Sequence, residues 1–136
     1  MKRRTYLKSV LAGAASLAAA GPATLNAAPG ASGKIQLHVD LSVDPAKEQE
    51  MLHNFQTVFR PAAAKQPGYV DAQMLKLHSA LQGSTPAGLN YRFALTFASE
   101  DLRQKWVASA THQKVWPTIE KTLSSTNYTV LLFDVA

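Results

Sequence analysis

The residues best suited to chemistry lie in the stretch KWVASATHQKVWP, from Lys105 to Pro117. It contains both tryptophans of the chain, Trp106 and Trp116, and one of the four histidines, His112. A neutral imidazole can accept and donate a proton near pH 7, and large aromatic rings can wall a site for a flat apolar molecule. These residue types predict a general base, His112, beside two substrate-binding tryptophans.

The same tryptophans can serve the hydrophobic core instead. Burying one indole removes roughly 200 Å² from water, which is worth several kcal/mol at about 25 cal/mol per Å². His112 and Trp116 share a predicted helical face with Ile119 and Leu123, since all four recur at helical spacing. The sequence leaves open whether this face is only core or also an active-site wall.

The helical pattern around His112 contains an interruption. Ser109 or Thr111 can cap a new helix, whereas Pro117 disfavours helical backbone at Trp116. We therefore expect two short helices with a break between Ser109 and Pro117.

The other polar residues are weaker candidates. His38 and Asp40 share one face of a predicted strand and can lie near Arg92, a combination that orients a ligand or forms a polar patch at an interface. No pair of carboxylates and no spacing of His, Asp or Glu is typical of a metal site. The absence of cysteine excludes thiolate and disulfide chemistry.

Periodic patterns place these residues on a small α+β fold. Residues 35–41, 69–77, 91–97 and 128–135 have the composition and alternation of strands. One helix should begin at Asp44-Pro45 and another after Ser99. The order predicts a ferredoxin-like βαββαβ unit, a four-stranded antiparallel sheet with its helices on one face. The buried stripe of the first helix should comprise Met51, Leu52, Phe55, Val58, Phe59 and Ala62.

Two further segments bear on the surroundings of the sheet. Residues 79–90 form a long connection that is either a surface loop or a flap over a cleft. The last strand is apolar on both faces, with Val130 and Leu132 on one and Leu131 and Phe133 on the other. Because one layer of helices cannot cover both faces of a sheet, we expect an identical subunit to cover the second, giving a homodimer.

The N-terminal segment has the layout of an export signal, with a basic start, a weakly apolar stretch and small residues at its end. We expect residues 1–27 to be a signal peptide, residues 28–34 a short linker and residues 35–136 the folded domain. The apolar stretch is too short for a permanent membrane span. A basic and apolar motif closely resembles the twin-arginine export signature, with a Sec-type signal as the alternative: Arg3, Arg4, Tyr6, Leu7 and Lys8. We expect a periplasmic or other extracytoplasmic location, and the twin-arginine machinery as a partner during export.

Charge excludes one class of partner. The formal net charge is +5, but four of the fourteen Lys and Arg residues fall within the first eight positions. From Pro29 onward ten basic residues oppose nine acidic ones. This balance lacks the clustered positive charge that nucleic acid binding requires.

Three segments carry a resemblance to a known family: HVDLSVD at 38–44, FRPAAAKQPGYV at 59–70 and WVASATH at 106–112. With them, about residues 35–135 resemble the antibiotic biosynthesis monooxygenase family of dimeric α+β barrel proteins. The resemblance implies a ferredoxin-like subunit whose sheet joins that of its mate, and a hydrophobic cleft between helices and sheet. Some members oxidise polycyclic aromatic compounds with dioxygen and without metal or flavin.

The resemblance also implies roles for particular residues. Trp106, Trp116, Phe93 and Phe97 would form the wall of the cleft, and His112 would take a proton from the substrate. A haem-degrading branch of the family uses an asparagine, a tryptophan and a haem-ligating histidine. In this chain Trp106 matches the tryptophan, but His38 occupies the asparagine position and Trp116 the ligand position. We therefore expect no cofactor, and the less favoured alternative is a haem-binding or haem-degrading protein in which His112 ligates the iron from a different turn.

Two classes of function remain open from the sequence. One is a cofactor-independent oxidation of a small hydrophobic or aromatic molecule, with His112 as the base. The other is a non-catalytic ligand-binding or stress-response dimer, whose cleft holds such a molecule without converting it. The sequence does not decide whether the protein is an enzyme.

Overall fold

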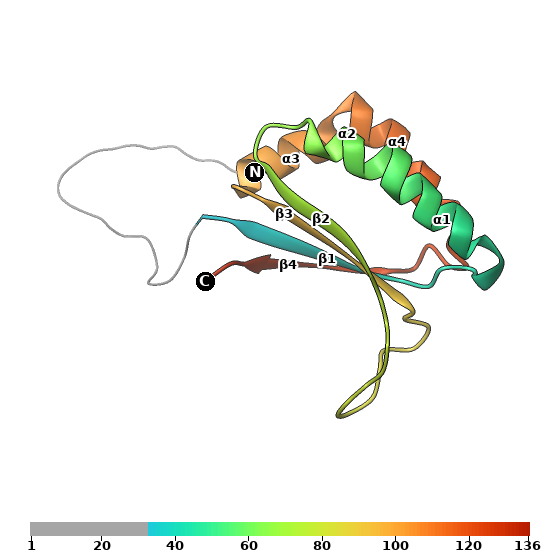
Figure 1. The fold of residues 1–136 in the computed structure, drawn as a ribbon. Coiled ribbons are helices and arrows are strands. Elements are labelled where there is room, and N and C mark those ends of the chain that lie inside the picture. Colours follow the sequence, from blue (N-terminus) through green and yellow to red (C-terminus); the bar gives the residue numbers. More distant parts are fainter. Residues whose placement is uncertain (1–32) are drawn as a thin grey trace, which may run out of the picture. The chain divides into compact units, whose positions relative to one another are not determined.

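The computed structural model describes residues 33–136. Strands and helices alternate along the chain in the predicted βαββαβ order (Figure 1). The strands are β1 (Ile35–Leu41), β2 (Tyr69–Lys76), β3 (Tyr91–Phe97) and β4 (Thr129–Asp134). The helical elements are η2 (Pro45–Lys47), α1 (Glu48–Asn54), η3 (Phe55–Phe59), α2 (Arg60–Ala64), α3 (Glu100–Ala108) and α4 (Ala110–Glu120). The expected signal peptide and its arginine motif lie outside the described residues.

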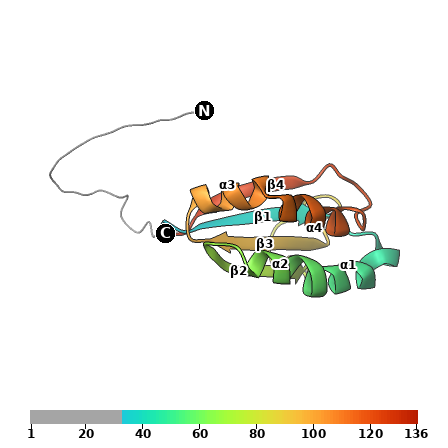
Figure 2. The same cartoon turned by 90° about the horizontal axis from the view of Figure 1, so that it is seen from above.

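The four strands form one antiparallel sheet in the order β2-β3-β1-β4. The helices lie in two rows over one face of it, α1 with α2 and α3 with α4 (Figure 2). The predicted α+β, ferredoxin-like fold is therefore confirmed. None of the helices between residues 33 and 136 has the length and hydropathy that crossing a lipid bilayer requires.

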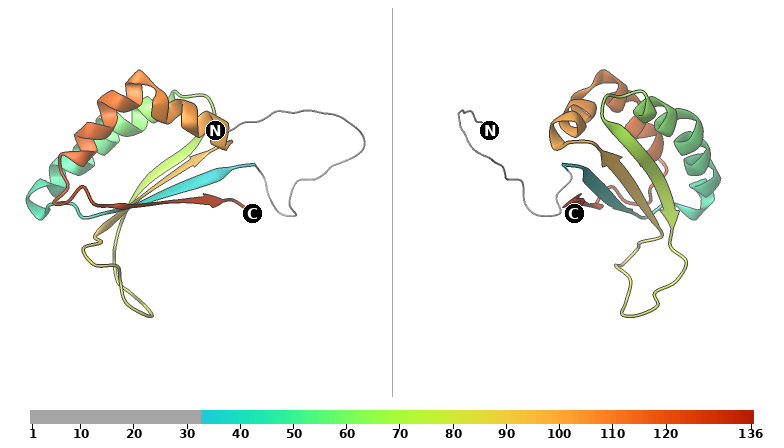
Figure 3. Two further views of the ribbon diagram at one scale, coloured as in Figure 1. Left: turned by 180° about the vertical axis from the view of Figure 1, so that it is seen from behind. Right: turned by 60° about the vertical axis from the view of Figure 1, so that its left-hand side comes forward.

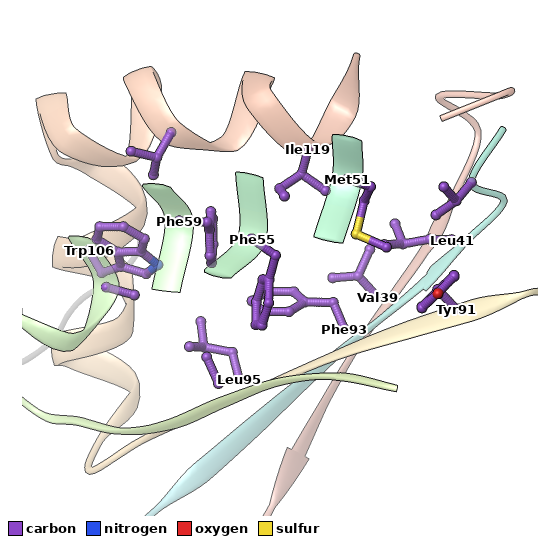
Figure 4. Close-up of a cluster of buried hydrophobic side chains, with 14 of the residues drawn as sticks. Val39, Leu41, Met51, Phe55, Phe59, Tyr91, Phe93, Leu95, Trp106 and Ile119 are labelled. Carbon is purple, nitrogen blue, oxygen red and sulfur yellow. The ribbon is translucent and has the colours of Figure 1, made fainter. Parts of the chain in front are cut away.

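Strand alternation brings apolar side chains to the helix-covered face of the sheet. In β3, Tyr91, Phe93, Leu95 and Phe97 are all buried, as the alternation predicted. They pack with residues of β1 and of the helices in one core, of which Figure 4 shows the central part. Burial of this apolar surface is the main source of stability in such a fold.

The first helical segment is less regular than predicted. The Asp44 carboxylate caps it by accepting a hydrogen bond from the Ala46 amide. Further along, η3 is a π-helical turn, in which the Arg60 amide donates to the Phe55 carbonyl five residues back. This wider turn ends two residues before Pro61, whose ring nitrogen has no hydrogen to donate.

The π-helical turn changes which side chains face the core. Met51, Phe55, Phe59 and Ala63 are buried, whereas Val58, expected in the buried stripe, is exposed. The prediction for Val58 is wrong because a constant helical period does not hold across η3.

The second helical segment breaks where the sequence indicated. Ser99 caps α3 and Ser109 caps α4, each with its side-chain oxygen accepting a backbone N–H. The backbone at Ser109 is extended, which separates the two helices. Contrary to expectation, α4 continues through Pro117, and Trp116 is helical. Gln113, whose carbonyl loses its helical donor at Pro117, is an exposed residue, so water can hydrate that group.

Residues 77–90 connect β2 and β3 and project away from the helices (Figures 1 and 3). Leu81 in this loop is 96 % exposed. The loop is a surface loop, and not a flap over the space between helices and sheet.

Gly68, just before β2, offers a test of the packing between sheet and helices. Its φ is +86°, and an added Cβ would lie 2.5 Å from Cδ1 of Leu102 in α3. We expect Gly68→Ala to lower the free energy of unfolding by about 3 kcal/mol, from left-handed strain and overpacking together. Denaturant unfolding measures the loss.

Gly83→Ala is the matched control for this substitution. Gly83 has a φ of +76°, but an added Cβ would meet nothing within 4 Å. It should therefore show only the backbone strain, about 1 kcal/mol. Equal losses in the two variants would contradict the proposed packing of Leu102 against Gly68.

Candidate functional site

A cavity of about 220 Å³ lies between the helix-covered face of the sheet and the helices η3, α3 and α4. Its lining is mostly apolar and aromatic: Leu37, Val39, Phe59, Phe93, Leu95, Arg103, Trp106, Val107, His112, Trp116, Tyr128 and Val130. Val130 belongs to the edge strand β4 and is itself exposed, so the cavity opens toward that edge. The cavity brings together His112 and three of the aromatic residues that the sequence singled out.

Four of the aromatic rings in the lining pack against one another. Phe59 is at their centre, with ring centroids 5.2 Å from Phe93, 5.8 Å from Trp106 and 5.9 Å from Trp116. All three contacts are edge-to-face, the arrangement that the ring quadrupoles favour. Trp106 is only 1 % exposed, so it is a core residue as well as part of the wall (Figure 4).

The corner between α3 and α4 sets the position of the histidine. The Ser109 hydroxyl donates to the Trp106 carbonyl at 2.6 Å and accepts the His112 amide at 3.1 Å. The His112 ring consequently lies edge-to-face with Trp106, at 5.1 Å, and parallel to Trp116, at 6.4 Å. The helix break thus places the imidazole beside both indoles.

The surroundings of His112 favour a neutral imidazole. Its Nδ1 atom is buried and has no hydrogen-bond partner in the described part of the chain. Burial lowers the pKa of His112, and the positive charge of Arg103 lowers it further. A neutral imidazole in an apolar cavity can act as a general base at neutral pH.

A chain of hydrogen bonds holds the Trp116 indole. Its Nε1–H donates to the Tyr128 hydroxyl at 3.1 Å, and that hydroxyl donates to the Glu120 carboxylate at 2.8 Å. Burial and the bond to Glu120 raise the pKa of Tyr128, so the phenol keeps its proton. These two hydrogen bonds fix the Trp116 ring in the wall of the cavity, and they engage both the indole N–H and the phenol O–H.

Arg103 supplies a charged group to the lining. Its Nε and Nη2 atoms donate to the two carboxylate oxygens of Glu100, each at 2.7 Å. Glu100 also accepts from Gln104 at 2.9 Å. The paired charges lower the pKa of Glu100 and raise that of Arg103, so both groups stay ionised.

Two residues proposed from the sequence lie outside the cavity. Phe97 is fully buried in the core and packs edge-to-face with Tyr69, at 6.3 Å. His38 is on the opposite face of the sheet, where it bonds Gln36 at 2.7 Å and contacts Phe133. The expected polar patch does form on that face, where Arg92 pairs with Asp40 at 2.6 Å. Neither Phe97 nor His38 is brought to His112.

Several lining residues were not identified from the sequence as site residues. Phe59 is in the predicted buried stripe of the first helix, and Leu37, Val39 and Leu95 fall within the predicted strands 35–41 and 91–97, where alternation indicates a buried face but no site. Arg103 carried a usable signal, because it precedes Trp106 by three residues and so shares its helical face. Nothing in the sequence indicated Tyr128 or Val107 as site residues, since only the packing of α3 and α4 against the sheet brings them to the cavity.

The residues of the cavity do not fit the haem-ligating pattern. Trp116, at the position where the haem-degrading proteins have their histidine ligand, cannot ligate iron, because the lone pair of the indole nitrogen belongs to the aromatic ring and its N–H donates to Tyr128. His38 cannot reach the cavity from the other face of the sheet. Among residues 33–136 no three His, Asp or Glu side chains are grouped so that they could hold a metal ion.

Solved structures support the fold. A candidate antibiotic biosynthesis monooxygenase from Caulobacter crescentus is 20 % identical, with a TM-score of 0.60 over 77 % of this chain and 92 % of that one. A mutant of SnoaB, a cofactor-independent oxygenase from Streptomyces nogalater, is 15 % identical, with a TM-score of 0.59 over 74 % and 91 %. A dimeric ferredoxin-like protein of unknown function from Jannaschia is 16 % identical, with a TM-score of 0.60 over 76 % and 99 %.

Sequence comparison adds no closer relationship. No protein-family model matches the chain, and no curated protein sequence matches it. At these identities the solved structures establish a shared fold and not a shared function.

The pKa of His112 can be tested directly. We expect its imidazole to titrate below the ordinary value of about 6.5, because burial disfavours the charged form. Replacing Arg103 and Glu100 together by Gln should move the titration midpoint of His112 only part of the way back toward the ordinary value, since burial is the larger cause of the shift. NMR titration of the imidazole signals measures both, with His112→Gln identifying the resonance.

The same shift predicts how stability depends on pH. Between the folded-state pKa and about 6.5 the unfolded chain binds more protons than the folded one, so the free energy of unfolding falls as the pH drops through this window. The His112→Gln variant should lack this contribution. A midpoint for His112 at or above 6.5 would contradict the burial of a neutral imidazole.

Proposed function

We propose that the cavity binds a small planar aromatic molecule and that the protein oxidises it with dioxygen, with His112 as general base and without a bound cofactor. The observation that carries this proposal is a partly buried imidazole of lowered pKa, in contact with two tryptophans, on the wall of an apolar cavity. A base of this kind needs a nearby acidic proton, and the aromatic wall selects a flat molecule to supply it.

The volume of the cavity limits the ligand. Drug-sized molecules occupy pockets of about 300–1,000 Å³, whereas an apolar cavity of about 150 Å³ holds benzene. The cavity of about 220 Å³ therefore suits one or two fused rings. A larger polycyclic compound or a porphyrin would require the edge at β4 to open further.

The proposed reaction converts an activated methylene group into a carbonyl. His112 takes one proton from the methylene carbon, and the electron pair remains on the substrate as an enolate. The enolate reduces dioxygen and forms a carbon–oxygen bond, and His112 returns its proton to give a hydroperoxide. Loss of water then leaves the carbonyl, so that CH2 and O2 yield C=O and H2O. The protein supplies a base, a water-poor site and an oriented ring.

The comparisons support this class of chemistry by fold. SnoaB is a cofactor-independent oxygenase, and the Caulobacter protein is a candidate antibiotic biosynthesis monooxygenase. A cavity between helices and sheet that contains a base is compatible with such a reaction. Binding without turnover is the competing outcome, and the substitution described next separates the two.

Replacing His112 should abolish turnover and leave binding intact. We expect His112→Gln to lower the rate of oxygen consumption with a suitable aromatic substrate by about 10²–10⁴-fold, the usual loss of a general base. Oxygen-electrode assays measure the rate, and quenching of tryptophan fluorescence measures binding, because both tryptophans line the cavity.

His53→Gln is the matched control. His53 is an exposed residue of α1 and does not line this cavity, so its replacement should leave turnover unchanged. If His112→Gln oxidises the substrate at the wild-type rate, His112 is not the base. Binding without oxygen uptake by the wild-type protein would favour the ligand-binding function.

We also propose that the protein is a homodimer. β4 is an edge strand whose four central apolar residues, Val130 to Phe133, are each 45–51 % exposed. They lie on both faces of the sheet, and the helices cover only one face (Figure 3). Contiguous exposed apolar surface of this kind is typical of an interface, and the Jannaschia protein of the same fold is dimeric.

A charge placed on the outer face of β4 should separate the subunits. We expect Phe133→Glu to reduce the mass in solution from two chains to one, because the carboxylate would lose its hydration in the interface. Leu81→Glu makes the same change of charge on the exposed loop and should stay dimeric. Light scattering measures the mass, and a monomeric wild-type protein would refute the proposed dimer.

Export remains part of the proposal. Residues 1–27, with Arg3, Arg4 and Lys8 before the apolar stretch, would direct the chain to the twin-arginine machinery. That pathway would deliver the protein already folded to the periplasm or an equivalent compartment.

A further inference from the structure

We propose that Arg103 forms an oxyanion-binding subsite of the cavity, so that the ligand is an aromatic compound with an acidic oxygen: a carboxylate, a phenolate or an enolate. This inference rests on the proposed function, because it concerns a ligand in the same cavity. It goes further by naming the polar group that the ligand must carry and the residue that binds it.

Charge distribution in the lining is the first argument. Arg103 is the only formally charged side chain among the twelve lining residues. Its side chain is 17 % exposed, so most of its surface is removed from water. An anion that enters the cavity meets one guanidinium, whose charge Glu100 compensates in part, in apolar surroundings where the attraction between charges is stronger than in bulk water.

The hydrogen-bonding capacity of Arg103 is the second argument. A guanidinium has five N–H donors, and Glu100 uses only one from Nε and one from Nη2. Within the described residues no side chain or carbonyl accepts from Nη1. Arg103 therefore keeps an unused pair of donors on a planar group that matches a carboxylate or an enolate oxygen.

Glu100 acts as a positioning residue for this subsite. Two bonds of 2.7 Å from Arg103 and one of 2.9 Å from Gln104 hold its carboxylate on the first turn of α3. The pair prevents the guanidinium from rotating freely, so little rotational freedom is lost when a ligand binds. Because Glu100 bonds the Nε and Nη2 atoms, an anion at Nη1 would be closer to the cation than to the carboxylate.

The relation between Arg103 and His112 is the third argument. The charge of Arg103 is close enough to lower the pKa of His112. It is therefore also close enough to stabilise negative charge on a ligand that His112 deprotonates. When the proton passes to His112, the electron pair of the broken bond would move to the ligand oxygen, and a hydrogen bond from Arg103 would stabilise the charge on that oxygen.

Two probes of nearly equal shape test the subsite without any turnover: 2-naphthoate, an anion at pH 7, and 2-naphthamide, its neutral counterpart. Tryptophan fluorescence of the full-length protein reports binding of both. We expect wild-type protein to bind 2-naphthoate at least tenfold more tightly than 2-naphthamide, as a charge-assisted hydrogen bond predicts. The Arg103→Gln, Glu100→Gln double variant should lose this preference and bind 2-naphthamide unchanged, because no unpaired carboxylate remains.

Lys105→Gln is the control, since it removes one positive charge from the exposed side of α3 and should keep the preference. Equal affinity of the wild-type protein for both probes would overturn the oxyanion subsite and leave the aromatic cavity standing. Binding of neither probe would overturn the subsite and the proposed ligand class together. If the wild-type protein prefers 2-naphthoate but takes up no oxygen with aromatic substrates that carry an activated methylene group, the subsite is supported and the oxidation is refuted.

Discussion

The two hydrogen bonds of the Ser109 hydroxyl are the constraint on which the candidate site depends. They join the end of α3 to the start of α4 across one extended residue. In an unbroken helix, residues six apart are rotated by about 240° around the axis, so Trp106 and His112 would point in different directions. The break brings their rings to 5.1 Å. Trp116, four residues after His112, then follows on the same face of α4.

Electrostatics in the cavity are consistent with this geometry. Burial and a nearby cation both favour the neutral form of His112. The indole of Trp116 donates its hydrogen to Tyr128, and the phenol of Tyr128 donates its hydrogen to Glu120. Proton exchange with a ligand near neutral pH therefore falls to the imidazole of His112. Arg103 remains charged beside it because Glu100 compensates that charge on the side away from its free donors.

The sheet separates two kinds of surface. Its helix-covered face contains the aromatic core and the cavity, and the opposite face contains the Asp40–Arg92 ion pair with His38 and Phe133 beside it. β4 contributes to both, since Val130 lines the cavity while Phe133 contacts His38 on the other side. A partner that covered this strand would change the exposure of the cavity's open edge as well as that of the outer face.

Local patterns in the sequence were sufficient for the fold and for part of the site. Strand alternation identified β1 and β3 with their buried faces, the serine caps located the starts of α3 and α4, and residue type identified His112, Trp106, Trp116 and Phe93. These features depend on neighbours within a few positions along the chain, which is why periodicity and capping rules detect them. The π-helical turn at η3 and the passage of α4 through Pro117 departed from those rules.

Tertiary structure alone decided which of these residues meet. Phe97 and Phe93 share one strand face, yet only Phe93 reaches the cavity, because the position at which α3 and α4 cross the sheet determines what they cover. Arg103 and Tyr128 joined the site for the same reason. The sequence by itself determined the elements, their faces and the residue types available. The packing of helices on the sheet selected the lining, since contacts between distant segments depend on how side chains interlock and are not encoded in any local period.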